Sequence, residues 1–329
     1  MRILVTGGAG FIGSHFVKRM LVAGEETVVL DKLTYSGNPA NLAGCDVPLV
    51  EGDIADPAAV ESAAAGCDAI VNFAAETHVD RSILGAAEFI QTDILGTYVL
   101  LQQVAATGAR LVQVSTDEVY GDVEAGQSST ESDVLLPSSP YSASKAGGDL
   151  QVLAAVRTFG ADASITRGSN TYGPNQYPEK VLPLFVTNAL DGEPLPLYGD
   201  GRQVRDWLHV DDHCAAIEVV LRRGRTGEIY NVAAGEEHEN RELTERILEH
   251  TGADRSLVRH VADRAGHDRR YSLDTRKLRS LGWQPVRKWE DGIRDTVAWY
   301  RDNRDWWEPI KRSGGYREYY ERQYAQRLS

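Results

Sequence analysis

A glycine-rich turn near the N-terminus constrains this chain more than any other segment. Residues 7–13, Gly-Gly-Ala-Gly-Phe-Ile-Gly, follow the short apolar run Arg2–Thr6 and open a helical pattern that runs to Ala23. Their spacing satisfies both GxGxxG and GxxGxxG. Such glycines permit a tight turn and let backbone N–H groups approach a pyrophosphate at the positive end of the helix. The turn therefore predicts a phosphate cradle between a strand and a helix.

A carboxylate at the end of the second apolar run strengthens this prediction. Asp31 stands where a carboxylate accepts hydrogen bonds from an adenosine ribose and repels a 2′-phosphate, which favours NAD over NADP. Asp53 and Ile54 follow the third apolar run and are expected to flank the adenine. A glycine turn without a ligand is the alternative, and the combination of strand, helix and Asp31 argues against it.

Short apolar runs alternate with longer helical patterns through the first half of the chain. Continuous apolar strands separated by helices are typical of a parallel sheet that is covered on both faces. We therefore expect an α/β fold with a doubly wound parallel sheet. The expected strands are Arg2–Thr6, Thr27–Asp31, Val47–Glu51, Ala69–Phe73, Arg110–Ser115 and Ser164–Gly168, and the expected helices are Phe11–Ala23, Pro57–Ala65, Ile83–Ala106 and Pro140–Thr158.

The second half of the chain has a different texture. From Gly173-Pro174 onward, prolines punctuate the sequence and the helical patterns become shorter. We expect a dinucleotide-binding domain over residues 1–173 and a smaller, mixed substrate domain over 174–329, with part of 203–232 packing back on the first. The aromatic and charged stretch that starts at Trp289 predicts a helix on the outside of the second domain.

Composition excludes several classes of protein. The 329 residues carry 48 acids and 35 bases, a net charge of −13, which argues against non-specific nucleic-acid binding. Three scattered cysteines without a CxxC pair predict neither a disulfide framework nor a zinc site, and no metal is expected. No apolar stretch approaches the roughly 20 residues that cross a membrane, and the N-terminus does not resemble a signal peptide. We expect a cytoplasmic protein.

A tyrosine and a lysine stand four residues apart at the start of an expected helix. Tyr141 and Lys145 therefore share a helix face and can reach the same point. A nearby ammonium and an oxidised nicotinamide both favour the phenolate, so the tyrosine could take a proton from an alcohol as hydride leaves its carbon. By itself the spacing is common in amphipathic helices, and the dinucleotide cradle upstream is what favours the catalytic interpretation.

A polar triplet ends the strand that precedes this helix. Thr116 can hydrogen-bond a substrate hydroxyl, and Asp117 and Glu118 are neighbouring carboxyl groups at the edge where such sheets bind ligands. In a regular strand the two carboxyl groups would point in opposite directions, so they share a site only if the chain turns there. Two carboxyl groups in different environments can divide acid and base roles. Two solvated loop carboxylates are the alternative.

The motifs GGAGFIG, FAAETHVDRS, VSTDEVYG, YSASK and RGSNTYGP, taken together, resemble the extended short-chain dehydrogenase/reductases that act on nucleotide sugars. Within that class the chain is similar, over nearly its whole length, to the dTDP-D-glucose 4,6-dehydratases. The discriminating feature is the triplet at 116–118, since related epimerases and decarboxylases lack both carboxyl groups there. A 4-epimerase, a dehydratase of another nucleotide sugar and a non-catalytic dinucleotide sensor remain as alternatives.

The resemblance implies a reaction and a role for each member of the site. Tyr141 would take the proton of the sugar C4 hydroxyl as hydride passes to NAD, with Lys145 lowering the tyrosine pKa and Thr116 bonding the C4 oxygen. Glu118 would remove the C5 proton, and Asp117 would protonate the departing C6 hydroxyl. Hydride would then return to C6, giving dTDP-4-keto-6-deoxy-D-glucose without net use of NAD.

The resemblance also implies binding residues and an assembly. A homodimer is expected, with the helices Ile83–Ala106 and Pro140–Thr158 pairing across a two-fold axis as a four-helix bundle. Thr171 stands where asparagine is common, which could alter a nicotinamide contact, and Thr77 stands where serine is expected. The implied NAD contacts, with those of the cradle, are Gly7, Gly10, Phe11, Ile12, Gly13, Asp31, Lys32, Leu33, Thr34, Asp53, Ile54, Phe73, Ala74, Ala75, Thr92, Tyr141 and Lys145. The implied contacts to the sugar nucleotide are Thr77, Thr116, Asp117, Glu118, Asn170, Lys180, Val181, Pro196, Tyr198, Arg205, Asn240, His267 and Tyr271.

Overall fold

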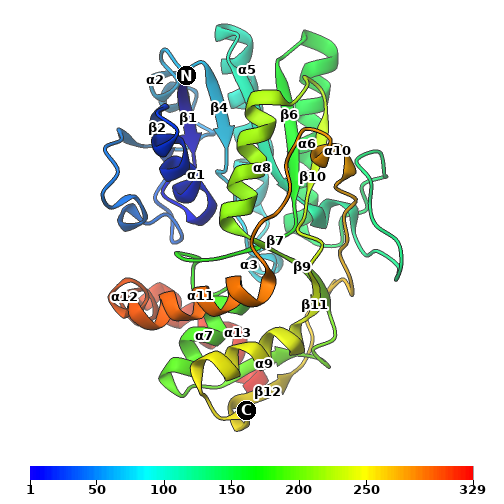
Figure 1. The fold of residues 1–329 in the computed structure, drawn as a ribbon. Coiled ribbons are helices and arrows are strands. Elements are labelled where there is room, and N and C mark those ends of the chain that lie inside the picture. Colours follow the sequence, from blue (N-terminus) through cyan, green and yellow to red (C-terminus); the bar gives the residue numbers. More distant parts are fainter. Residues whose placement is uncertain (329) are drawn as a thin grey trace.

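A seven-stranded parallel sheet forms the larger lobe of the protein, whose computed structural model describes residues 1–328 (Figure 1). The strand order is β10-β6-β5-β4-β1-β2-β3, so the chain starts in the middle of the sheet and winds outward in both directions. The expected doubly wound fold is confirmed. The strands are β1 (Arg2–Thr6), β2 (Glu26–Asp31), β3 (Leu49–Glu51), β4 (Ala69–Asn72), β5 (Arg110–Thr116), β6 (Ala163–Gly168) and β10 (Ile229–Val232).

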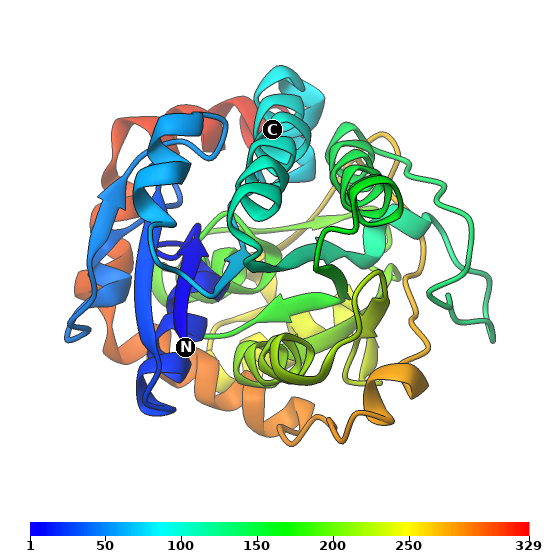
Figure 2. The ribbon, with the colours of Figure 1, turned by 90° about the horizontal axis from the view of Figure 1, so that it is seen from above.

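Helices cover both faces of this sheet, as the view from above shows (Figure 2). Alternate residues of a strand point to opposite faces, and in β1 Ile3 and Val5 enter one apolar core while Leu4 enters the other. Because both faces are buried, the strand is apolar throughout and not alternating. The covering helices are α1 (Phe11–Val22) and α8 (Val210–Arg223) on one face and α2 (Pro57–Ala63), α5 (Thr97–Thr107) and α6 (Pro140–Phe159) on the other.

The expected single helix over Ile83–Ala106 is wrong. The chain forms α3 (Val79–Leu84), leaves helical geometry at Gly85, and resumes as α4 (Ala87–Phe89), a π-helical segment η2 (Ile90–Gly96) and α5. Gly85 has extended backbone angles and ends α3. The apolar pattern continues across this break although Ile83 and Leu84, just before it, are 45% and 40% exposed while α5 packs in the core of the large sheet, so periodicity alone did not reveal it.

The smaller lobe combines two short sheets with helices, and its apolar core is separate from those of the large sheet. One sheet has the order β11-β9-β7 and the other pairs β12 with β8. Its strands are β7 (Asn170–Tyr172), β8 (Leu195–Tyr198), β9 (Val204–His209), β11 (Glu237–Glu239) and β12 (Val258–Val261). Its helices are α7 (Val181–Asp191), α9 (Asn240–Thr251), α11 (Trp289–Asp302), α12 (Arg304–Arg312) and α13 (Gly314–Leu328), and the short turns of the chain are η1 (Pro39–Leu42), η3 (Asp117–Tyr120), η4 (Arg255–Leu257) and α10 (Arg276–Arg279).

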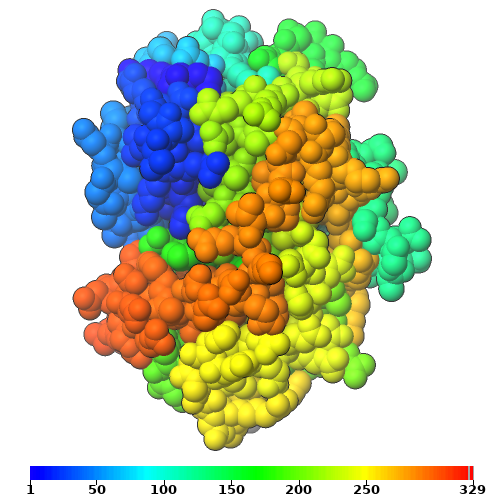
Figure 3. Space-filling model, viewed as in Figure 1, coloured from blue at the N-terminus to red at the C-terminus, as the bar shows by residue number. Residues whose placement is uncertain are grey.

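The aromatic C-terminal stretch forms three helices, where one was expected. They do not simply cover the lobe from outside, because Trp307 and Tyr300 have no exposed surface and belong to its core. The segment just before them ties the lobes together: α10 packs on β10 of the large sheet, whereas α11 packs on α9 and α7. Figure 3 shows this segment, in orange, passing over both lobes. Within residues 1–328 no helix is long and apolar enough to span a membrane.

Candidate active site

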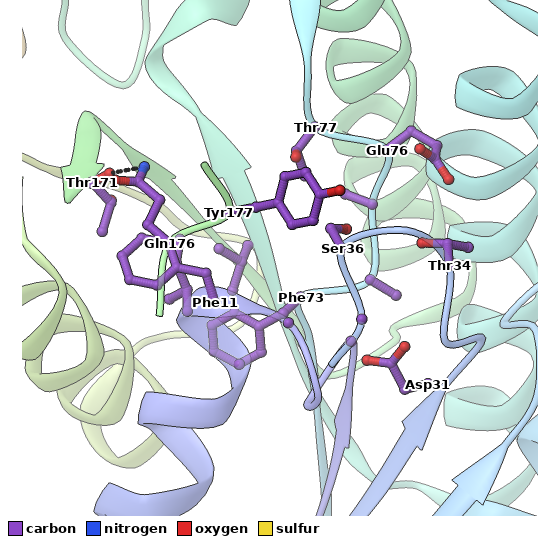
Figure 4. A pocket seen from close by; sticks show the side chains of 18 of the residues that line it. Phe11, Asp31, Thr34, Ser36, Phe73, Glu76, Thr77, Thr171, Gln176 and Tyr177 are labelled. Carbon is purple, nitrogen blue, oxygen red and sulfur yellow. Dashed lines mark hydrogen bonds between the residues drawn. The ribbon is translucent and has the colours of Figure 1, made fainter. Parts of the chain in front are cut away.

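A cavity of about 570 Å³ lies at the carboxyl ends of the large sheet's strands and extends to the smaller lobe (Figure 4). Strand order brings this edge together from segments far apart in the sequence, as expected for a doubly wound sheet. Most of the expected site residues line the cavity. They are Gly7, Gly10, Phe11, Ile12, Gly13, Asp31, Lys32, Thr34, Asp53, Ile54, Phe73, Ala74, Ala75, Thr77, Thr92, Thr116, Asp117, Glu118, Tyr141, Lys145, Asn170 and Lys180.

The glycine turn has the shape of a phosphate cradle. Gly7 adopts a φ of +66°, and a Cβ atom there would lie 2.6 Å from the backbone nitrogen of Ala74, so a side chain would collide with the next strand's end. Gly10 caps α1 without any side-chain hydrogen bond. The first N–H groups of α1 therefore open into the cavity with the helix dipole behind them, which fits the pyrophosphate of NAD.

Asp31 is buried at the end of β2 and is held by backbone donors. One carboxylate oxygen accepts the N–H of Ala9 at 2.9 Å and the other accepts that of Leu33 at 2.8 Å. Burial raises the pKa of Asp31, and these two bonds oppose the rise. Nearby, Lys32 and Asp53 form an ion pair of 2.8 Å on the cavity rim. The carboxylate fits a ribose diol, because each oxygen keeps a further lone pair.

A sharp turn after β5 brings the two expected catalytic carboxyl groups to one cavity. The chain enters η3 directly after Thr116, so Asp117 and Glu118 do not alternate as they would in a strand. The Thr116 hydroxyl donates to Asp117 Oδ1 at 3.1 Å and accepts the N–H of Glu118 at 3.3 Å. The chain therefore turns after β5, as the sequence analysis required if the two carboxyl groups were to share a site.

The first turn of α6 places the tyrosine and lysine beside this triplet. Ser139 and Ser142 form a reciprocal capping box, and Pro140 occupies the first turn, which together fix the start of the helix. Tyr141 and Lys145 are buried and line the cavity, and Lys145 Nζ donates to the carbonyl of Val114 at 2.9 Å. Burial and the neighbouring Glu118 raise the pKa of Tyr141. In the protein alone the expected lowering is thus not met, and a bound cationic nicotinamide has to supply it.

The two carboxyl groups occupy different electrostatic environments. Burial and the charge of Glu118 raise the pKa of Asp117 to about 8, and its Oδ2 atom is buried without a hydrogen-bond partner among residues 1–328. Burial also raises the pKa of Glu118, but the cations Arg264, Lys180 and Arg205 oppose that rise. At neutral pH Asp117 therefore holds a proton, and Glu118 is the group that nearby positive charge favours as an anion.

Several expected substrate contacts lie beside the cavity and not on its wall. Among them, Arg205 is buried with its guanidinium 4.3 Å from the centre of the Tyr271 ring, and the rings of Tyr198 and His267 are 5.9 Å apart. The expected residues outside the cavity lining are Leu33, Val181, Pro196, Tyr198, Arg205, Asn240, His267 and Tyr271. The charge of Arg205 nevertheless acts on both Asp117 and Glu118, which places this cluster next to the carboxyl pair.

Sequence reasoning missed an arginine of this cluster. Arg264 has a mostly buried side chain, lies 3.6 Å from Asp80 and is the foremost of the cations that oppose the pKa rise of Glu118. It stands in the motif Asp-Arg-Ala-Gly-His-Asp, from which only His267 was singled out. His78, to which no chemistry was assigned, is buried with Nε2 3.4 Å from the carbonyl of Glu179.

Part of the cavity wall could not be foreseen from motifs. Trp306 of α12 lines it and donates through Nε1 to Asn41 Oδ1 at 2.9 Å, which joins the C-terminal helices to the cofactor side. Tyr177 projects between Thr77 and Ser36 (Figure 4). An aromatic residue in a C-terminal helix is usually explained by packing, and no spacing in the sequence marks it as part of a site.

Comparison with known proteins places the chain in a family. The family model described as GDP-mannose 4,6 dehydratase matches residues 4–296. The dTDP-glucose 4,6-dehydratase of Streptomyces niveus is 54% identical over 323 residues, covering 94% of this chain and 96% of that protein.

Solved structures agree with that placement. The dTDP-glucose 4,6-dehydratase DesIV of Streptomyces venezuelae, with NAD and TYD bound, superimposes with a TM-score of 0.92 at 57% identity, covering 94% of this chain and all of that one. The UDP-glucose 4-epimerase of Thermus thermophilus, in complex with NAD, is more distant, with a TM-score of 0.87 at 34% identity, covering 92% of this chain and all of that one. The chain therefore belongs to the dTDP-glucose 4,6-dehydratase family.

Proposed function

We propose that the protein converts dTDP-D-glucose into dTDP-4-keto-6-deoxy-D-glucose and water, as an NAD-dependent hydro-lyase. The observation that carries this proposal is the carboxyl pair: Asp117 and Glu118 line one cavity with Tyr141, burial and the charge of Glu118 raise the pKa of Asp117, and nearby cations oppose the pKa rise of Glu118. Elimination of water needs one group to give a proton while another takes one, and a single carboxyl group cannot do both in the same step.

In this proposal the glycine turn and Asp31 hold NAD. When bound, NAD accepts hydride from C4 and later gives hydride to C6. Tyr141 takes the C4 hydroxyl proton, and Thr116 holds the C4 oxygen. Lys145 stabilises the tyrosine anion. This assignment is supported by the positions of Thr116, Tyr141 and Lys145, which all line the cavity.

Asp117 and Glu118 then carry out the elimination of water and the return of a proton to C5. Glu118 takes the C5 proton, made acidic by the C4 ketone, while Asp117 protonates the C6 hydroxyl, which leaves as water. Glu118 later returns its proton to C5 as hydride reaches C6. One turnover leaves Tyr141 protonated and Asp117 ionised, so one proton has to pass from the first to the second. The Thr116 hydroxyl, bonded to Asp117 Oδ1 and beside Tyr141, offers a route.

The nucleotide end of the substrate falls, in this proposal, to the basic residues next to the carboxyl pair. Arg205 and Lys180 would hold the diphosphate, because a guanidinium and an ammonium are suited to phosphate oxygens and both act on Glu118. The remaining sugar-nucleotide contacts are proposed as Thr77, Asn170, Val181, Pro196, Tyr198, Asn240, His267 and Tyr271. Asn240 has a buried Oδ1 without a partner among the described residues, which suits a ligand donor.

The assay for this function uses purified protein and dTDP-D-glucose. We expect a product with the alkaline absorbance of a 4-keto sugar, without stoichiometric addition of NAD, and deuterium at C5 when the reaction runs in D₂O. Formation of dTDP-galactose would show an epimerase instead, and absence of any conversion would reject the assignment. A UDP-glucose arm measures how strictly the nucleotide is recognised.

The proposal includes a homodimer and a cytoplasmic site of action, where NAD is available. The helical surface formed by η2, α5 and α6 exposes large apolar side chains, with Leu150 56%, Ile90 55%, Leu95 46% and Tyr98 46% exposed. Burying such a surface against its copy would form a four-helix bundle. Light scattering should give twice the chain mass of 36.1 kDa. Leu150→Glu should shift the protein toward monomer, whereas Glu124→Gln should not.

A further inference from the structure

Thr171, the residue that departs from the expected asparagine, makes three hydrogen bonds on the cavity wall. Its hydroxyl lies 2.7 Å from His213 Nδ1 and donates to the carbonyl of Ser169 at 3.2 Å. Its own carbonyl accepts Nε2 of Gln176 at 2.9 Å, the dashed contact in Figure 4. A hydroxyl has one proton, so its donation to one partner fixes what the other partner must be.

These bonds decide which atoms of His213 and Gln176 donate hydrogen bonds and which accept them. The carbonyl of Ser169 can only accept, so both contacts are hydrogen bonds at once when the Thr171 proton goes to that carbonyl and His213 Nδ1 donates to the Thr171 oxygen; we assign this tautomer. Burial lowers the pKa of His213 to about 4, so the ring is neutral and holds only that proton. His213 Nε2 is therefore a bare acceptor. In the same way, the carbonyl of Thr171 takes the amide nitrogen of Gln176 and leaves its Oε1 as an acceptor.

Both acceptors are buried and lack a partner. His213 Nε2 and Gln176 Oε1 have no hydrogen bond among residues 1–328, and the two side chains are only 2% and 9% exposed. Both residues line the cavity. The Cε1–Nε2 edge of the imidazole lies against Gly168, where an added Cβ would be 2.6 Å from Cε1 and 2.8 Å from Nε2. Buried acceptors left unpaired are costly, so this wall suits a ligand that donates hydrogen bonds.

The position of the wall selects which part of the ligand reaches it. Gly168 lies opposite Thr116 in the register of β5 and β6, one strand away from the catalytic residues. Asp31, at the adenosine end, ends β2, which lies four strands from β6, or about 19 Å at the usual strand spacing. Phe11, at the start of α1, lines the same cavity as Thr171 and Gln176. A dinucleotide with its adenosine on Asp31 therefore brings its nicotinamide end to this wall.

We propose that Thr171 is a positioning residue that fixes His213 Nε2 and Gln176 Oε1 as acceptors for the N–H groups of the nicotinamide carboxamide. The inference rests on the proposed binding of NAD in this cavity. The carboxamide would thereby hold the ring in one orientation over the catalytic residues, and a dinucleotide without amide N–H groups would be rejected.

The test compares NAD with acetylpyridine adenine dinucleotide, in which a methyl group replaces the amide nitrogen. Dissociation constants are measured by calorimetry on nucleotide-free protein, without substrate. We expect the wild-type protein to bind the analogue at least tenfold more weakly than NAD. His213→Asn keeps an amide N–H near the position of Nδ1 but removes the Nε2 acceptor, and the ratio of the two constants should fall to within about threefold.

Matched variants separate this role from a structural one. Thr171→Ser keeps the hydroxyl and should keep the discrimination, whereas Thr171→Val should lose it, and His260→Asn, in β12 and outside the cavity, should change nothing. Equal binding of both dinucleotides by the wild-type protein would overturn the inference while leaving NAD binding intact. So would an unchanged ratio in folded His213→Asn and Thr171→Val. Failure of the wild-type protein to bind either dinucleotide would reject the proposed function itself.

Discussion

Two buried acids stand at the carboxyl ends of strands of the same sheet and behave differently: Asp31 is the last residue of β2, and Asp117 directly follows β5. Asp31 is 7% exposed and Asp117 is 3% exposed, so desolvation acts on both. Each oxygen of Asp31 accepts a backbone N–H, whereas Asp117 has one bond from Thr116, one oxygen without a partner among the described residues and the charge of Glu118 beside it. Donors stabilise an anion, and their absence stabilises the acid.

The difference assigns different work to the two ends of the cavity. At the β2 end, backbone groups made by the glycine turn and the loop after β2 hold an acceptor ready for hydroxyl donors. At the β5 end, side chains from separate elements set protonation states. The cofactor end is thus built for binding and the β5 end for proton transfer, and substitutions should affect them unequally.

The largest effect is expected from Glu118→Gln, which keeps shape and removes the base. Product formation should fall by about 10²–10⁴-fold, because proton removal from C5 has no other group in place. Oxidation at C4 should persist in part, visible as the near-ultraviolet absorbance of reduced dinucleotide in a single turnover. Glu124→Gln, outside the cavity, is the control. Normal dehydration by the Glu118 variant would place the base elsewhere and end the contrast drawn between the two strands.

Asp117→Asn tests the unpaired acid through stability. The folded-state pKa of about 8 lies above the unfolded value near 3.8, so the folded protein binds more protons between these values. Stability from this group is therefore fully present below about pH 4 and is lost as pH rises toward 8. Because pH 7 lies about three pH units above the unfolded value, removing the titration should stabilise the protein by at most about 4 kcal/mol there.

Thermal unfolding of both proteins from pH 5 to pH 8 measures this difference, which should grow with pH. Because Asp117 loses its proton above about pH 8, we also expect the activity of the wild-type protein to decline there. Asp117→Asn should have much lower activity, and that activity should not show this decline. A variant that is less stable than wild type at pH 7 and nearly equal at pH 5 would show that Asp117 is an anion in the folded protein.

Asp31→Asn probes the other strand end and should act on affinity. The side chain keeps its size and one acceptor oxygen, but it loses the charge and one of the two bonds from Ala9 and Leu33. We expect NAD to bind about 10- to 100-fold more weakly, and the preference for NAD over NADP to shrink, since no anion repels a 2′-phosphate. Calorimetric titration with NAD and with NADP measures both affinities. Unchanged affinity for NAD would remove Asp31 from the ribose.

The cofactor end was the part most accessible from sequence, and the reason is physical. A strand, a glycine turn and a helix are local in the chain, and buried parallel strands are apolar on both faces, so β1 and the cradle follow from adjacent residues. The sequence indicated only that Asp117 and Glu118 could share a site if the chain turned after β5. Whether it turns there depends on backbone angles that composition does not reveal.

The rest of the site depends on contacts between distant segments. Trp306 meets Asn41 across 265 positions, and His213 meets Thr171 across 42. Trp306 and His213 look like ordinary packing residues in their own segments, and the departure at Thr171 did not reveal its partner. The break at Gly85 escaped for a related reason, since the apolar pattern of α3 continues into α5. Long-range pairing, and not local propensity, decides these positions.

The smallest effect is expected at the rim of the cofactor end, from Lys32→Met. Lys32 and Asp53 are 2.8 Å apart, but the lysine side chain is 44% exposed and the aspartate also accepts the N–H of Ala55 at 2.9 Å. Exposed ion pairs are screened by water and salt, so the variant should lose less than about 1 kcal/mol of stability.

Affinity for NAD should change by less than about threefold, because in this proposal the anion at Asp31 and the backbone donors of the cradle carry the binding and a rim charge does not. Titrating Lys32→Met and Asp31→Asn with NAD at low and high salt compares the loss of affinity in the two variants. A loss for Lys32→Met as large as that for Asp31→Asn, and strongest at low salt, would mean that side-chain charge governs binding at the β2 end as well. The two strand ends would then differ in ligand only and not in how they are built.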